Sequence, residues 1–183
     1  MKEKACRLLG LFAALVSAEA IGHGPHVHGT GELNVAVENN TIDIEFHSPL
    51  DNLLGFEHAP RTDAQRAAIR AMTARLNKPE TLFKLPKAAA CTPGPTSIDS
   101  PLGDSPATPS TSAKAAHQRE PADEHADLTA TFVFVCASIA RLDSIEVALF
   151  DAFPGTRTIK AEIVGPRGQA AATLSPDRRV IKL

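Results

Sequence analysis

Histidine side chains near the N-terminus and at two later points of this 183-residue chain could bind a metal ion. His26 and His28 are two residues apart, so on extended backbone both imidazoles project to the same side and can share one ion. His58 lies in a proline-bounded segment, and His125 stands two residues before Asp127. Imidazole and carboxylate groups bind zinc, and imidazole also binds copper. These five residues are therefore candidate ligands for a divalent metal.

Each histidine also has a plain structural interpretation. The N-terminal pair can be an accident of its position near a cleavage site, and a histidine in a tight loop, such as His58, often serves only as a hydrogen-bonding group. We interpret His47 as a surface residue and His117 as a solvated one, because they lie on a polar strand face and in a polar tract. The sequence has no nucleophile elbow, phosphate-binding glycine loop or helical zinc-protease motif. A zinc hydrolase that uses Glu57 stays open as an alternative.

The first 20 residues have the layout of a secretory signal peptide. Charged residues up to Arg7 precede an apolar run at residues 8–16, and small residues follow, with cleavage expected after Ala18 or Ala20. The apolar run is shorter than the roughly 20 residues that cross a bilayer. The sequence therefore predicts an exported protein that does not span the membrane once mature.

Cysteine usage agrees with export. Cys6 would leave with the signal peptide, and Cys91 and Cys136 remain as an even pair in an oxidising compartment. A disulfide between them would close a loop of about 45 residues and contribute about 3–4 kcal/mol. Two unpaired thiols are the alternative.

Composition narrows the class of protein. The formal net charge is −2 and the chain has neither Trp nor Tyr, so it lacks the basic and aromatic surface typical of nucleic-acid binding. Hydrophobic residues make up 43% of the chain, enough for a core. We expect one domain over residues 21–183.

Periodicity predicts the elements of that domain. Alternating runs at 30–38 and 41–47, joined at Asn39 and Asn40, indicate a β-hairpin. Thr62 and Gln65 form a capping box before a helix over 63–77. Alternation also predicts further strands near residues 126–136, 145–149, 159–163, 170–174 and 180–183. The result is an α+β fold, with an antiparallel β-sheet packed against one main helix.

Two segments between these elements have a different character. Residues 48–61 are punctuated by prolines and a glycine, and we expect a packed loop with one helical turn. Residues 92–121 are rich in Pro, Ser and Thr and nearly lack large apolar residues, so they bury too little surface to offset their ordering entropy. We expect 92–121 to be a long disordered, flexible insertion.

Several segments together resemble one known family. They are His26-Val27-His28-Gly29-Thr30-Gly31-Glu32-Leu33-Asn34-Val35-Ala36-Val37, residues 48–60, Leu82-Phe83-X-Leu85-Pro86, His125-Ala126-Asp127-Leu128 and Leu149-Phe150-X-X-Phe153-Pro154. In this order they resemble the ZrgA-like family of exported, zinc-regulated bacterial proteins. The resemblance implies a periplasmic protein that is expressed under zinc limitation and associated with zinc acquisition or binding. A disulfide between Cys91 and Cys136 also fits the family pattern.

The chain departs from the family in its variable loop. Family members commonly carry a tract rich in His, Asp and Glu there, whereas this loop is rich in Ser, Thr and Pro and holds only His117 before Glu124 and His125. The departure moves the expected metal ligands to His26, His28, His58, His125 and Asp127.

The leading hypothesis is a non-enzymatic periplasmic zinc-binding protein that acts in zinc acquisition or homeostasis, with a metal-uptake transporter or envelope protein as possible partner. The sequence does not choose between zinc and copper, and zinc is preferred on the resemblance. The alternative is an accessory interaction module without functional metal, which docks on a transporter or envelope complex through residues 51–60.

Overall fold

The computed structural model describes residues 27–102 and 126–183. The predicted signal peptide at 1–20 lies outside the described residues, as do His26, His117 and His125. Within the described residues no helix is long and apolar enough to cross a membrane.

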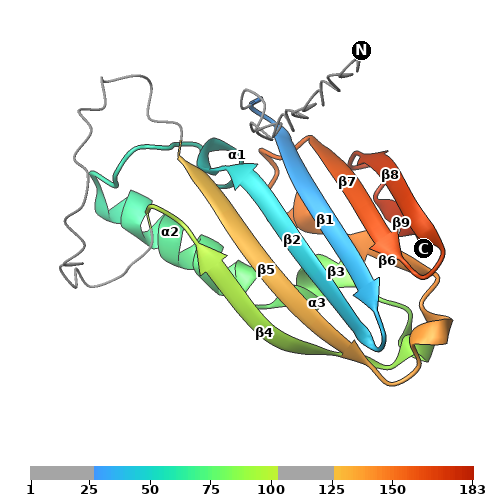
Figure 1. Ribbon diagram of the computed structural model, residues 1–183. Coiled ribbons are helices and arrows are strands. Elements are labelled where there is room, and N and C mark those ends of the chain that lie inside the picture. Colours follow the sequence, from blue (N-terminus) through green and yellow to red (C-terminus); the bar gives the residue numbers. More distant parts are fainter. Residues whose placement is uncertain (1–26, 103–125) are drawn as a thin grey trace, which may run out of the picture.

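A six-stranded sheet forms one layer of the molecule, with strand order β4-β5-β2-β1-β7-β8 (Figure 1). Its strands are β1 (Thr30–Glu38), β2 (Thr41–Pro49), β4 (Cys91–Asp99), β5 (Asp127–Cys136), β7 (Thr158–Gly165) and β8 (Gly168–Leu174). The predicted hairpin is confirmed as β1 and β2, and Asn39 in the turn has a φ of 53°. The other predicted strands are also present.

The α+β class is confirmed, and the main sheet is mixed. All of its neighbouring strands pair antiparallel except β1 and β7, which run parallel from Thr30↔Thr158 to Ala36↔Val164. The chain between β2 and β7 passes through the second layer and returns to the end of the sheet at which β1 begins. A parallel pair needs such a long crossover connection.

The second layer covers one face of the main sheet (Figure 1). It contains a three-stranded sheet of order β3-β6-β9 together with short helices. Its elements are α1 (Leu50–Leu54), α2 (Asp63–Leu76), α3 (Pro79–Leu82), β3 (Phe83–Lys84), η1 (Lys87–Ala89), η2 (Ile139–Arg141), β6 (Ser144–Val147), α4 (Leu149–Ala152) and β9 (Val180–Lys182). The helical turn expected within 48–61 is α1.

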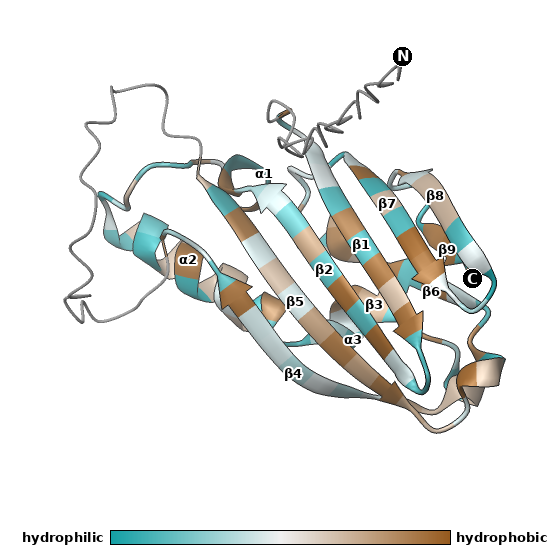
Figure 2. Cartoon of the chain, viewed as in Figure 1, coloured by the Kyte–Doolittle hydropathy of each residue, from teal (hydrophilic) through white to brown (hydrophobic). Residues whose placement is uncertain are grey.

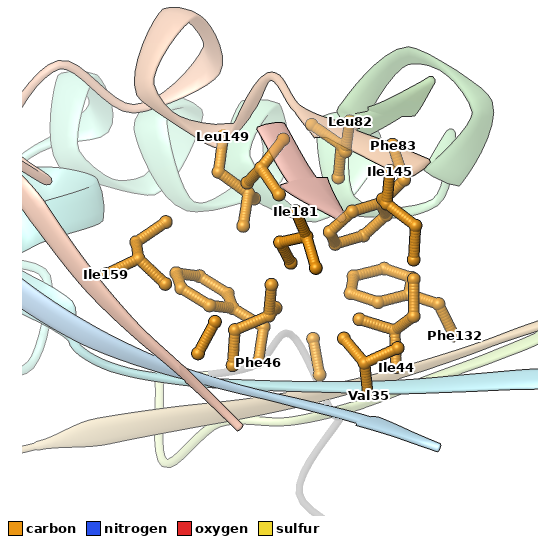
Figure 3. Packing of buried hydrophobic residues seen from close by; sticks show 14 of the residues in the cluster. Val35, Ile44, Phe46, Leu82, Phe83, Phe132, Ile145, Leu149, Ile159 and Ile181 are labelled. Atoms are coloured by element: carbon orange, nitrogen blue, oxygen red, sulfur yellow. The ribbon is translucent and has the colours of Figure 1, made fainter. Parts of the chain in front are cut away.

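The hydrophobic core fills the space between the two layers. Hydropathy alternates along the strands of the main sheet, so that only one face is apolar (Figure 2). In Figure 3, Val35, Ile44 and Phe132 point from this face toward the second layer, where Phe83 and Ile181 point back. The Phe83 and Phe132 rings meet edge to face with centroids 5.2 Å apart. Burial of this alternating face is the main source of stability.

Helix α2 begins as the sequence predicts. Thr62 accepts a hydrogen bond from the Gln65 N–H at 3.2 Å, and the Gln65 side chain accepts one from the Thr62 N–H at 3.2 Å. The helix ends at Leu76, one residue before the predicted end, and buries Ile69, Met72 and Leu76.

Removing the cap of α2 should lower the stability of the protein only slightly. We expect Thr62→Ala to lower the free energy of unfolding by about 1 kcal/mol, because the Gln65 N–H then loses its acceptor. Urea denaturation of the variant and the parent protein measures the difference. Thr62→Ser keeps the hydroxyl acceptor and should be near neutral; an equal loss in both variants would contradict the capping role.

The prediction of disorder over 92–121 is wrong for its first part. Residues Cys91–Asp99 form β4, which pairs antiparallel with β5. Composition misleads here because an edge strand needs hydrogen-bond partners on one side only and buries little surface. Pro93 and Pro95 lie where the register shifts, and prolines are tolerated at such bulges on an edge.

The predicted disulfide between Cys91 and Cys136 is present. The two residues face each other in the register of β4 and β5. Cys136 is 1% exposed and belongs to the core. The disulfide therefore ties the edge strand to the body of the sheet.

Candidate functional site

Two of the predicted ligands that the structure describes, His28 and Asp127, lie at one end of the main sheet. There β1 begins, β2 ends and β5 begins, since Glu32 pairs with His47 and Pro49 pairs with Asp127. Helix α1 follows β2 directly and lies at this end (Figure 1). We call it the α1 end, made of residues 27–32, 47–58 and 126–129.

Asn52 connects the chain segments that meet at the α1 end. Its side chain is buried and accepts a hydrogen bond from the Gly29 N–H at 2.6 Å. Its Nδ2 donates to the Thr30 carbonyl at 2.9 Å and to Ser48 Oγ at 3.0 Å. Gly155 packs against the backbone of Asn52 so closely that a Cβ there would overlap the Asn52 carbonyl. Asn52 thus fixes the segment before β1 against α1.

The segment before β5 is held at the same place. The Leu50 N–H donates to the Ala126 carbonyl at 2.8 Å. Val27 and Ala126 are the first residues of the two described segments, and they follow His26 and His125 directly in the sequence. Both described segments therefore start at the α1 end.

His28 pairs with a carboxylate of α1. Its Nδ1 lies 3.2 Å from Asp51 Oδ2, with side-chain exposures of 53% and 37%. A carboxylate beside one imidazole nitrogen favours the tautomer that carries its proton there. The same kind of contact to a carboxylate is common for histidines that bind zinc.

His47 and Asp127 form a second pair on the outer face of the sheet, away from the core. His47 Nε2 lies 3.8 Å from Asp127 Oδ2, and its Nδ1 lies 3.2 Å from Thr129 Oγ1. His47 lies on the polar face of β2, as the sequence predicts, and its side chain is 24% exposed. Cross-strand pairing of β2 and β5 brings these residues together.

His58 makes a local contact instead. Its Nδ1 and the Ala59 carbonyl are 2.9 Å apart, and its ring lies 5.4 Å from that of Phe56. The side chain is exposed. This geometry agrees with the hydrogen-bonding role that the sequence left open for it.

Among residues 27–102 and 126–183, no group of three or more His, Cys, Asp or Glu side chains is arranged to hold a metal. His26 and His125 lie outside these segments, so the full set of His26, His28, His58, His125 and Asp127 stays a prediction. Sequence reasoning missed Asp51 and His47. The only signal for Asp51 was its place in the segment that resembles the family.

Comparison with protein-family models identifies the family of the chain. A protein-family model described as "ZrgA family zinc uptake protein" matches residues 25–183. No curated protein matches the chain. The matched range covers all the described residues, including every side chain at the α1 end.

Proposed function

Because the chain belongs to the ZrgA family of zinc uptake proteins, we propose that it is a non-enzymatic periplasmic protein that binds zinc for its acquisition or homeostasis. The observation that carries the proposal is the pairing of His28 with Asp51 at the α1 end. The disulfide agrees with an oxidising compartment.

The proposed site centres on His28. Its Nε2 would ligate zinc while Asp51 holds the Nδ1 proton, a division of roles that recurs in zinc proteins. His26 is two residues away and would contribute a second imidazole. His125 and Asp127 would complete the site from the start of β5. Because protons compete with zinc for neutral imidazole, zinc affinity should fall as the pH is lowered.

Calorimetric titration of tag-free mature protein with zinc tests this proposal. We expect His28→Ala to weaken binding about tenfold or more because a ligand is lost, and Asp51→Asn to weaken it by about tenfold because the imidazole loses its orienting carboxylate. Asp177→Asn is the matched control, since it removes an exposed carboxylate from a turn outside the α1 end. Single alanine variants of His26, His58 and His125 assign the remaining ligands.

Two outcomes would count against the site. Equal zinc affinity in the parent protein, His28→Ala and Asp51→Asn would place the metal elsewhere. Equal losses in Asp51→Asn and Asp177→Asn would mean that net charge, and not geometry, sets the affinity.

A second candidate is an accessory module that docks on a transporter or envelope complex without functional metal. Elemental analysis of untagged mature protein separates the two: the zinc-binding proposal expects about one zinc per chain, and the module expects negligible metal.

A further inference from the structure

The two edge strands of the main sheet differ in how strongly their sequences discourage pairing with a further strand. Edge strand β4 carries Pro93 and Pro95 and a register shift, which discourage pairing with another strand. Edge strand β8 (Gly168–Leu174) contains no proline and no charged residue, and it is exposed over most of its length. It lies at the opposite side of the sheet in Figure 1. An edge strand without proline or charged residues can pair with an added strand.

The hydrogen-bond ladder shows which groups β8 offers. The Thr158 N–H donates to the Gly29 carbonyl at 2.9 Å, so Thr158 and every second residue after it in β7 face β1. Ile159, Ala161 and Ile163 then face β8, where they pair with Leu174, Ala172 and Ala170.

The residues of β8 between these partners have their backbone groups directed away from β7. They are Gln169, Ala171 and Thr173. Among the residues that the structure describes, none pairs with these N–H and C=O groups, which form a row along the edge of the sheet.

An apolar groove adjoins the same strand. It encloses about 470 Å³, and its wall includes Gly168, Gln169 and Ala170 of β8. Apolar side chains from β1, η2, β7 and the segment after β9 also line it, among them Val37, Ile139, Leu142, Ile163 and Leu183. A strand paired with β8 would direct every second side chain to the face on which this groove lies.

The charged residues around β8 indicate which charge a partner segment should carry. Arg167 precedes the strand and Arg178 follows it, and neither forms an ion pair with another described residue. Asp143 in the groove already accepts a hydrogen bond from Ser144 Oγ at 2.7 Å. Antiparallel pairing of two copies about Ala171 would set Arg167 opposite Ser175, three residues from Arg178 of the other copy. This pairing brings positively charged strand ends toward each other, whereas an acidic segment complements them, so the charges favour an acidic partner over a second copy.

We propose that β8 receives an extended segment of another protein as a further strand of the main sheet. The segment has aliphatic side chains at alternate positions, which enter the groove, and carboxylates at its ends, which meet Arg167 and Arg178. The groove lies at the end of the main sheet opposite the α1 end, and strand pairing at β8 does not depend on zinc binding.

A synthetic peptide of sequence ETVSVTVSE, labelled with a fluorophore, tests the proposal by fluorescence anisotropy with the mature protein. We expect a dissociation constant below about 100 µM. Ala171→Pro should weaken binding about tenfold, because proline removes an outward N–H and leaves the bonds to β7 intact. Ala171→Ser keeps the N–H and should bind within about twofold of the parent. Thr173→Pro repeats the test if Ala171→Pro fails to fold.

Two further measurements locate the contact and its charge preference. Amide exchange followed by NMR should show slower exchange for Gln169, Ala171 and Thr173 when peptide is bound, with β4 unchanged. The peptide KTVSVTVSK should bind about fivefold more weakly, because its lysines approach the arginines.

Three results would overturn the proposal. The first is the absence of binding at about 1 mM peptide. The second is equal binding of the peptide by the parent protein and by Ala171→Pro. The third is self-association of the free protein that Ala171→Pro abolishes. The last would assign the edge to a second copy of the chain.

Discussion

Replacing Cys91 and Cys136 together by serine should lower the free energy of unfolding by about 4 kcal/mol. The disulfide closes a loop with a sequence separation of 45, and removing it returns that loop's conformational entropy to the unfolded chain. The loss is large relative to the total stability of an ordinary domain, about 5–15 kcal/mol. Urea denaturation of the Cys91→Ser/Cys136→Ser variant and the oxidised parent measures it.

The structural consequence should be concentrated in β4. This strand pairs with β5 alone, its residues are at most half-buried, and its register shifts between Pro93 and Thr96. Without the disulfide its amides should exchange faster than those of β1 and β2. Reductant should destabilise the parent to the level of the double variant and leave the variant unchanged. A loss below about 1 kcal/mol would show that the unfolded chain gains little freedom.

Asn52→Ala should cost about 3 kcal/mol and also weaken zinc binding, although Asn52 is not a proposed ligand. The substitution leaves the Gly29 N–H, the Thr30 carbonyl and the Ser48 hydroxyl without their partner at a buried position. Each such loss carries a desolvation penalty of about 1–3 kcal/mol, which partial relaxation reduces. The segment that carries His28 is then no longer held against α1 and Asp51.

Two measurements test this role of Asn52. Urea denaturation gives the stability, and calorimetric titration with zinc at a temperature where the variant is folded gives the affinity. Asn34→Ala is the matched control, because Asn34 is an exposed asparagine of β1 whose side chain makes one 3.4 Å hydrogen bond to Glu45. It should change stability by less than about 0.5 kcal/mol. If Asn52→Ala bound zinc like the parent, the buried contacts would not organise the site.

Much of the fold could be predicted because its signals are local. Alternation along residues 30–47 predicts the β1 and β2 hairpin, since side chains of a strand alternate between its two faces. The Thr62 and Gln65 capping box marks the start of α2 for a similar reason, because the groups that bond lie three residues apart. The disulfide was predicted from the number of cysteines in a chain expected to be exported.

The elements that were missed depend on the neighbours of a segment. Strand β4 has the composition of a disordered segment and is ordered by pairing with β5 and by the disulfide. The parallel pairing of β1 with β7 depends on the path of the chain through the second layer. No local pattern encodes either feature.

The candidate site also combines features that are local in the sequence with contacts that depend on the tertiary structure. The sequence by itself determined the pair His26 and His28, because two imidazoles two residues apart are a local arrangement, and it determined membership of the family. Only the tertiary structure decided that Asp51 lies beside His28 and that Asp127 lies beside His47. These partners are distant in the sequence, and the register of the sheet and the buried contacts of Asn52 bring them together. Register depends on the packing of one whole face against the core, so residue types alone cannot predict such pairs.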